Sequence, residues 1–238
     1  MKQSLKTAFR HIGVEVTRIN STATTACRRL TMMRHERIDT VIDVGANVGQ
    51  YASELRESGY GGDIFSFEPL SQAFADLSKK AHGDANWRLF QTAIGAENGE
   101  AEINISRNSF SSSLLPMLET HIQAAPESRY LSTAPVSVRT LDTALQDIPL
   151  KDRRALLKID TQGYEEPVLR GAANSLRQVY LVECELSLVP LYEGQCLFLD
   201  MVDKLAVLGF SPVHFEPAFV DEATGYCLQI DGIFARSH

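Results

Sequence analysis

Two acids and two glycines in the first third of the chain are spaced as in a nucleoside-binding site. Asp43 lies in an apolar run at residues 41–44, and Gly45 follows that run. A glycine there lets the backbone turn sharply and approach a ligand, and the helical pattern that begins after Gly49 offers free N–H groups. Glu68 ends the next apolar run, where an acid binds the two ribose hydroxyls. We therefore expect a cofactor that contains a nucleoside.

The spacing of the glycines separates the candidate cofactors. Dinucleotide folds use G-x-G-x-x-G, which lets the backbone touch a pyrophosphate, whereas residues 45–49 here read G-A-N-V-G. The carboxylate of Asp43 would repel a phosphate but suits an ammonium or sulfonium group, and S-adenosylmethionine (SAM) carries both. The pattern favours SAM over a nicotinamide cofactor, which would make the chain an oxidoreductase. A strand–turn–helix corner without any ligand is the other alternative.

The expected contacts with SAM follow from the chemistry of its parts. Two adjacent ribose hydroxyls need a two-oxygen acceptor, which we assign to Glu68. Leu70 and Ala93 are expected to enclose the adenine, and Asn47 and Gly49 to hold the methionine end. The predicted cofactor-binding set is Asp43, Gly45, Ala46, Asn47, Gly49, Glu68, Pro69, Leu70, Thr92 and Ala93.

Three further residues are candidates for the transfer step, in which an acceptor hydroxyl must lose its proton to a base or a metal. Asp160 ends another apolar run and is the first candidate to orient or deprotonate the acceptor. Glu183 shares a strand face with Glu185. These two acids could raise each other's pKa or bind Mg²⁺ together with Asp160. His214 is the last base candidate, and each of these residues has a purely structural alternative.

Six short motifs resemble one known family when they are taken in order. They are D-V-G-A-N-x-G at 43–49, F-E-P at 67–69, A-I-G at 93–95, S-V-R-T-L-D at 137–142, K-I-D-T-Q-G-Y-E at 158–165 and D-G-I-F-A-R at 231–236. The chain is similar to the FkbM family of SAM-dependent methyltransferases over about residues 38–236. The family's fourth-strand motif usually has an acid before the glycine, where this chain has Gln162.

The resemblance implies an O-methyltransferase, which moves the methyl group of SAM to a hydroxyl. Many members of the family act on sugars of glycans or glycolipids, and others on polyketides or other natural products. A binding module that holds SAM without turnover is a further alternative. The implied fold is a Rossmann-like class I α/β fold, with a mostly parallel seven-stranded sheet and an antiparallel C-terminal strand.

The elements that must position these residues alternate between strands and helices. Strand patterns lie at about 41–44, 64–67, 87–93, 155–160, 179–183, 210–215 and 226–235, and clear helical patterns at 71–82 and 196–208. Asn98-Gly99 predicts a hairpin with a return strand at 101–105. Residues 106–135 lack a clean pattern, as is common for a lid or binding loop. The carboxyl ends of the strands share one edge, so the candidate residues are expected to line one crevice.

The charge of the chain is unevenly distributed. Of its 238 residues, the first 38 hold eight Lys or Arg against two Glu, whereas the remainder holds 15 basic and 28 acidic residues. An acidic body argues against a nucleic acid substrate, because neutralisation of phosphates dominates that affinity. The length suits one large domain, which we place at 39–238 after a basic helical extension at 1–38.

The N-terminal extension has the pattern of an amphipathic helix. Leu5, Phe9, Ile12, Val16 and Ile19 share one helical face, with basic residues outside it. We expect this helix to pack on the domain or on a second subunit as a homodimer; peripheral contact with an anionic membrane is the alternative. The chain has no hydrophobic core of a signal peptide, which favours the cytoplasm, with any membrane contact at the inner face.

Overall fold

β1 (Thr40–Val44) is an interior strand of a seven-stranded sheet in a computed structural model that describes residues 24–146, 148 and 150–237. The strand order is β3-β2-β1-β7-β8-β10-β9. β1 pairs in parallel with β2 and β7, β2 with β3, and β7 with β8, whereas β10 is antiparallel to both β8 and β9. This is the predicted class I arrangement. The other strands of this sheet are β2 (Asp63–Phe67), β3 (Trp87–Phe90), β7 (Ala155–Ile159), β8 (Val179–Ser187), β9 (Phe210–Val220) and β10 (Cys227–Arg236).

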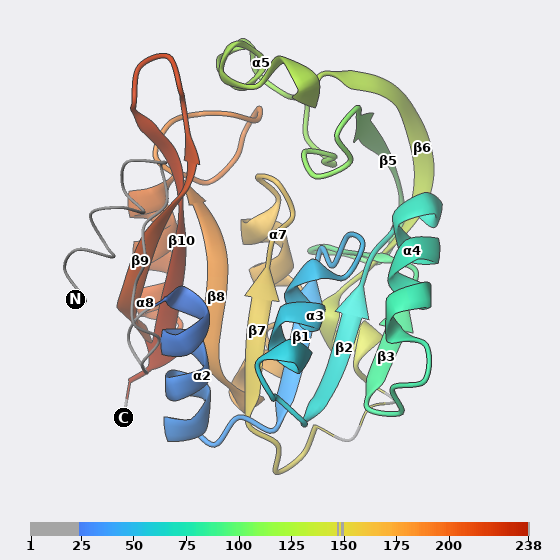
Figure 1. Ribbon diagram of the computed structural model, residues 1–238, viewed down its shortest axis with the longest axis vertical. Helices are drawn as coiled ribbons and strands as arrows, with labels where there is room; N and C mark the ends of the chain where they lie inside the picture. The colour runs from blue at the N-terminus through green and yellow to red at the C-terminus, as the bar shows by residue number, and fades with distance from the viewer. Residues whose placement is uncertain (1–23, 147, 149, 238) are drawn as a thin grey trace, which may run out of the picture.

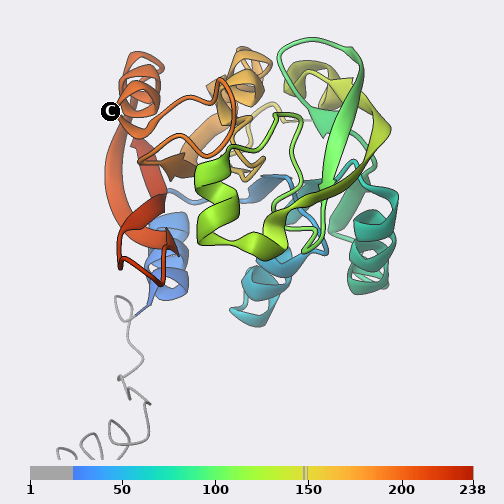
Figure 2. The ribbon, with the colours of Figure 1, turned by 90° about the horizontal axis from the view of Figure 1, so that it is seen from above.

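Helices cover both faces of the sheet, because its inner strands are buried and largely apolar on both faces (Figures 1 and 2). One face is covered by α2, α3 and α4, whose Met33, Leu55 and Leu77 pack with Val41 and Leu156 of the sheet. The other face is covered by α6, α7, η2 and α8. The helices are α2 (Thr25–His35), α3 (Gln50–Glu57), α4 (Ser71–Ala81), α6 (Leu141–Ala144), α7 (Glu165–Arg170), η2 (Ser175–Gln178) and α8 (Phe198–Val207).

A second, three-stranded sheet in the order β4-β6-β5 rises above the carboxyl ends of the main strands (Figure 1). Two short helices follow β5 and lead into β6. The bounds are β4 (Ala93–Ile94), β5 (Gly99–Ser106), α5 (Glu119–Ala124), η1 (Pro126–Ser128) and β6 (Tyr130–Arg139). This sheet places the segment between β5 and α5 over the edge where the candidate residues meet.

One expectation about this region is corrected. The hairpin predicted at Asn98-Gly99 is wrong: β5 pairs antiparallel with β6, while β3 pairs with β2 in the other sheet. The dipeptide still turns the chain, but the partner strand comes from farther along the sequence. The segment 106–135, which showed no clean pattern, contains α5, η1 and the first half of β6.

The N-terminal extension is described only from residue 24, so the amphipathic helix predicted within residues 5–19 lies outside the described part. The described remainder of the extension forms α2, which begins at the N-cap Thr24. Its Met33 is 2% exposed and belongs to the same apolar cluster as β1. α2 is therefore packed into the sheet domain.

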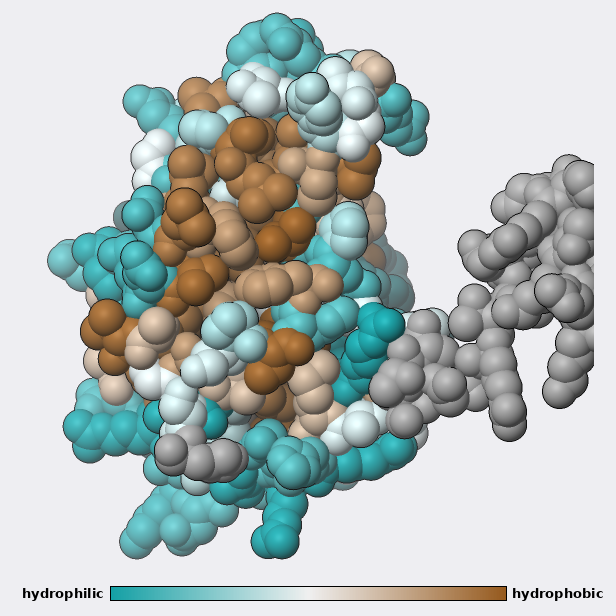
Figure 3. Space-filling model, turned by 90° about the vertical axis from the view of Figure 1, so that its left-hand side faces the viewer, coloured by the Kyte–Doolittle hydropathy of each residue, from teal (hydrophilic) through white to brown (hydrophobic). Residues whose placement is uncertain are grey.

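An apolar surface lies on the side of the molecule formed by α8 and β9 (Figure 3). Its exposed side chains are Leu199, Val207, Leu208, Val213, Phe215 and Val220. Within the described residues, no helix has the length and apolar character needed to cross a bilayer.

Candidate active site

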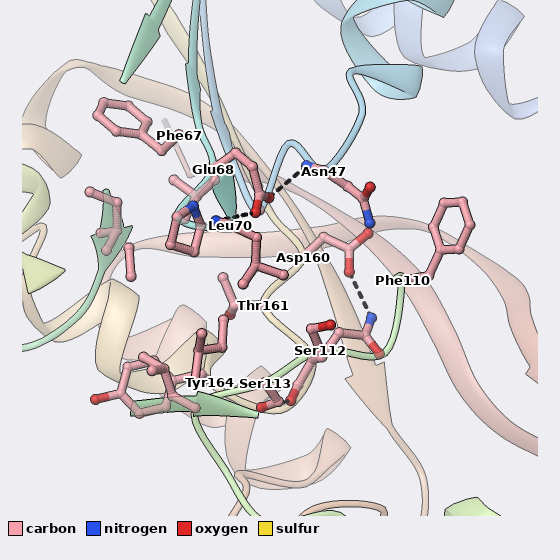
Figure 4. A pocket seen from close by; sticks show the side chains of 18 of the residues that line it. Asn47, Phe67, Glu68, Leu70, Phe110, Ser112, Ser113, Asp160, Thr161 and Tyr164 are labelled. Carbon is pink, nitrogen blue, oxygen red and sulfur yellow. Dashed lines mark hydrogen bonds between the residues drawn. The ribbon is translucent and has the colours of Figure 1, made fainter. Parts of the chain in front are cut away.

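A cavity of about 250 Å³ opens at the carboxyl edge of the main sheet. Its walls come from the turns after β1, β2 and β7, from the start of the second sheet, and from the segment that follows β5 (Figure 4). Glu68, which follows β2, and Asp160, which follows β7, both line it. Turns after two separate strands therefore contribute carboxylates to one cavity.

The turn after β1 is built for close approach of two backbones. Gly45 has φ +83°, and a Cβ atom added there would lie 1.9 Å from the carbonyl oxygen of Asp160. No side chain fits that gap, so glycine is required both by conformation and by space. Asn47, two residues on, also has a positive φ of 47°. The turn thereby brings the ends of β1 and β7 together beneath the cavity.

Glu68 links the turns after β1 and β2 through both of its carboxylate oxygens (Figure 4). Oε2 accepts from the backbone N–H of Asn47 at 2.9 Å, and Oε1 accepts from that of Leu70 at 2.8 Å. The side chain is buried, and burial raises its pKa to about 7 despite the two N–H donors. Its orientation is thus fixed, and each oxygen keeps a lone pair for a ribose hydroxyl.

Asn47 has a buried side-chain oxygen with no hydrogen-bond partner among the described residues. An unpartnered buried acceptor is costly, and this one lies on a residue that lines the cavity. The ammonium group of SAM would supply the missing donor. Leu70, Ala93, Ile103 and Leu114 give the same cavity an apolar part that suits an adenine ring.

The acidic end of the cavity holds Asp160, Gln162 and Glu185. The Nε2 atom of Gln162 donates to Asp160 Oδ1 at 2.9 Å and to Glu185 Oε2 at 3.0 Å, so one amide bridges two carboxylates. Gln162 has φ +55°, and its backbone oxygen accepts from the hydroxyl of Ser113 at 2.7 Å. The segment after β5 is therefore tied to this end of the cavity.

Lys158 lies under the acidic end and is almost fully buried. Its Nζ atom is 3.2 Å from Asp160 Oδ2. Burial alone would lower the pKa of Lys158, but the charges of Asp160, Asp231 and Glu183 outweigh burial and raise it. The ammonium group therefore stays charged and compensates the nearby carboxylates.

Comparison with known proteins assigns the chain to a family. The family described as Methyltransferase FkbM domain matches residues 43–212, which span β1 to the start of β9 and include every residue of the acidic end. The chain belongs to the FkbM methyltransferase family. It is accordingly a SAM-dependent methyltransferase.

Two relatives of this FkbM protein show how far the similarity extends. The 2-O-methyltransferase NoeI of Sinorhizobium fredii is 24% identical over 184 residues, which cover 75% of each chain. The crystal structure of an FkbM methyltransferase from Methylobacillus flagellatus KT superposes with a TM-score of 0.51 at 13% identity, over 83% of this chain. That match covers 43% of the other protein, so this chain spans less than half of its length. The likeness shows a shared fold.

The cavity of this FkbM protein gathers most of the predicted cofactor residues. The predicted cofactor residues that line the cavity are Gly45, Asn47, Glu68, Pro69, Leu70, Thr92 and Ala93. Asp43, Ala46 and Gly49 lie outside the lining. Asp43 is buried behind the turn, where the hydroxyl of Ser66 donates to it at 3.0 Å, and burial raises its pKa to about 6. Gly49 is the N-cap of α3 and packs against Leu77 and Trp87.

The three predicted catalytic residues are not brought together. Asp160 lines the cavity, whereas Glu183 and His214 lie outside its lining. Glu183 is paired with Arg29 beneath α2. His214 is on β9, where its Nε2 lies 3.3 Å from Thr25 Oγ1. β8 continues to Ser187, so Glu183 lies within the strand and not at its end, and no local pattern indicated that α2 covers it.

Sequence reasoning assigned no role to several residues of the cavity. Gln50, Phe110 and Tyr164 line it, and the position of Phe110 depends on how the segment after β5 folds over the edge. Glu185 entered the sequence argument only as a neighbour of Glu183. The departure from the family pattern at Gln162 was the one available signal, because it marked the residue that bridges the two acids.

Proposed function

We propose that this protein transfers the methyl group of SAM to a hydroxyl of a sugar, in a glycan or a glycolipid. The observation that carries the proposal is a single cavity whose lining combines Asn47, Glu68 and an apolar part with the carboxylates of Asp160 and Glu185. The cofactor would supply an electrophilic methyl group on its sulfonium, and an acceptor held at the acidic end would lie beside it. Holding both partners is a large part of catalysis.

The residues that would hold SAM are those with matching donors and acceptors. Glu68 would accept from the ribose hydroxyls, Asn47 from the ammonium group, and Leu70 and Ala93 would contact the adenine. Polar groups of the chain would thus meet the ribose and the ammonium of SAM, and apolar groups its adenine. Asp160 would accept a hydrogen bond from the hydroxyl of the methyl acceptor and orient that hydroxyl.

A sugar suits the acidic end because its hydroxyls need several acceptors and amide groups close together. Asp160, Gln162 and Glu185 offer these within one hydrogen-bonded group. Phe110, 55% exposed, presents an aromatic ring at the same end, which suits the C–H face of a sugar (Figure 4). The relative NoeI is named a 2-O-methyltransferase, which supports an oxygen acceptor here.

A glycolipid acceptor would bring the protein to a membrane surface. We propose that the basic N-terminal segment makes peripheral contact at the inner face in that case, and that the apolar surface on α8 and β9 would otherwise serve a homodimer. Deletion of residues 1–20 would weaken liposome binding without changing SAM affinity. Unchanged liposome binding would reject the membrane contact.

The test is transfer of a labelled methyl group from SAM to a panel of methyl hexosides and glycolipids, with and without EDTA. We expect label in a sugar product. Label found only in phenolic or polyketide hydroxyls would replace the sugar by a natural product. SAM binding without any transfer would instead indicate a non-catalytic module. Loss of transfer with EDTA, restored by Mg²⁺, would add a metal to the site.

A further inference from the structure

Glu185 presents its carboxylate to the cavity in a fixed orientation. Its Oε2 atom accepts from Gln162 Nε2 at 3.0 Å and from Gln229 Nε2 at 2.7 Å. Among the described residues, no donor contacts the other oxygen, Oε1. One oxygen is therefore anchored by two amides, while the second keeps its lone pairs for a ligand in the cavity that Glu185 lines.

Gln162 is held so that its amide nitrogen faces both acids. The hydroxyl of Tyr192 donates to Gln162 Oε1 at 2.8 Å, which leaves Nε2 to bridge Asp160 and Glu185. Tyr192 is fully buried. A flipped amide would place an oxygen against two carboxylates and lose both of those hydrogen bonds, so the network favours this orientation.

The two acids differ in the charge of their partners. Asp160 is paired with the ammonium of Lys158, whereas the anchored oxygen of Glu185 meets only neutral amides. Burial raises the pKa of Glu185 well above the usual range of a glutamate. The charged groups around it come from several elements: Asp160, Glu165 and Asp231 raise this pKa further, and Lys158 opposes them. The buried hydroxyl of Tyr192 also faces it.

We propose that Glu185 is the general base that takes the proton of the acceptor hydroxyl, with Gln162 as the positioning residue that holds it beside Asp160. The inference rests on the proposed function. The hydroxyl oxygen forms a bond to the methyl carbon as the carbon–sulfur bond breaks, and the electron pair of that bond stays on sulfur. The proton passes to Glu185 Oε1 and then to solvent. The products are a methyl ether and S-adenosylhomocysteine.

A general base at Glu185 and an orienting acid at Asp160 fit the different partners of the two side chains. Proton transfer is efficient when the base has a pKa near the working pH. Asp160 is held by Lys158 and Gln162, which suits orientation of a second hydroxyl. Two carboxylates in different surroundings thus have different tasks.

The first test compares E185Q, D160N and wild type, with E166Q as a control on α7 outside the cavity. We expect E185Q to lower kcat by about 100-fold or more, to keep SAM affinity within about threefold by calorimetry, and to lose the acidic limb of the pH–rate profile. D160N should keep that limb and raise the KM of the acceptor. E166Q should resemble wild type. An E185Q enzyme with normal kcat and pH profile would overturn the assignment, as would loss of the limb in D160N.

A second test needs no acceptor. Burial also raises the pKa of Glu68 and of Glu165, so NMR of protein with ¹³C-labelled glutamate carboxyls should show several glutamates that titrate above the usual range, of which one is missing from E185Q. In Q162E a third carboxylate would adjoin the first two, so this titration should move to higher pH and the acidic limb with it. A Glu185 that titrates as an ordinary glutamate would overturn the proposal.

These readouts separate two kinds of failure. If wild type transfers no methyl group to any hydroxyl, the proposed function fails, whatever Glu185 does. If wild type is active and Glu185 titrates normally, the proposed function stands and the base is another group.

Discussion

The guanidinium of Arg29 in α2 clasps the carboxylate of Glu183 in β8, 154 residues farther along the chain. Nε lies 2.8 Å from Oε2 and Nη2 lies 2.7 Å from Oε1, and both side chains are buried. The hydroxyl of Tyr51 donates to the same carboxylate at 2.8 Å. This network joins α2, α3 and the main sheet, so α2 contributes to the stability of the sheet domain.

Removal of Arg29 should therefore destabilise the whole domain. R29A leaves Glu183 buried without its cation, and we expect a loss of about 3–5 kcal/mol in the free energy of unfolding. Urea denaturation followed by circular dichroism measures this loss. In the double variant R29M/E183M the charges are removed together, so most of the stability should return. A loss below about 1 kcal/mol in R29A would mean that the pair is dispensable.

Gly45 should tolerate no side chain, because its missing Cβ faces the carbonyl of Asp160. Gly59 is a matched control: its φ of +89° is equally unfavourable for other residues, but a Cβ there meets nothing within 4 Å. G59A should cost only about 1–2 kcal/mol of conformational strain. G45A should in addition weaken SAM binding more than tenfold in calorimetry. Equal effects of the two variants would show that backbone strain alone explains the glycine.

Binding of SAM should depend on pH through Glu68. Burial raises the pKa of Glu68 to about 7, and only the ionised carboxylate can accept from both ribose hydroxyls. SAM affinity should therefore increase as the pH rises from 6 to 8, which spans this value. In E68Q the affinity should be weaker and should lose this part of its pH dependence. Calorimetric titrations at three pH values test the point; a pH-dependent E68Q would move the effect to another group.

The same shift affects stability in the opposite direction. A carboxyl whose pKa is raised on folding favours the folded state at low pH, and this contribution is lost as the pH rises through the folded pKa. For Glu68 the loss begins near the ordinary value of 4.5 and is complete slightly above about pH 7. Without SAM, E68Q should therefore gain stability relative to wild type as the pH rises from about 5 to about 7, as thermal unfolding would show. A constant difference between the two proteins across this range would contradict the raised pKa.

Phe110 should affect the acceptor and not the cofactor. F110A removes the aromatic ring at the acidic end of the cavity, and we expect the KM of a sugar acceptor to rise by about tenfold, equivalent to about 1.4 kcal/mol, with SAM affinity unchanged. Leu131, 62% exposed and outside the lining, is a control for the loss of an exposed apolar side chain. A KM unchanged in F110A would leave the ring without a role in acceptor binding.

The sequence by itself determined the class of fold and most of the residues to which we assign SAM binding. Apolar runs followed by Gly45 and Glu68 define a strand–turn–helix–strand unit, and such local patterns are legible because they depend on neighbours in the chain. Most of the predicted cofactor residues line the cavity for this reason. Asp43 was placed in the cavity because its sequence position is beside the turn, but its side chain points into a buried contact with Ser66.

The tertiary structure alone decided the acidic end. Glu183 and Glu185 are the same residue type on the same face of one strand, so the sequence does not distinguish which of them faces the cavity. Packing of α2 pairs Glu183 with Arg29, whereas the loops place Glu185 beside Gln162 and Asp160. The pairing of β5 with β6 likewise joins residues that are far apart in the sequence. Contacts between segments far apart in the chain have no local pattern, and these contacts set which carboxylate faces the cavity.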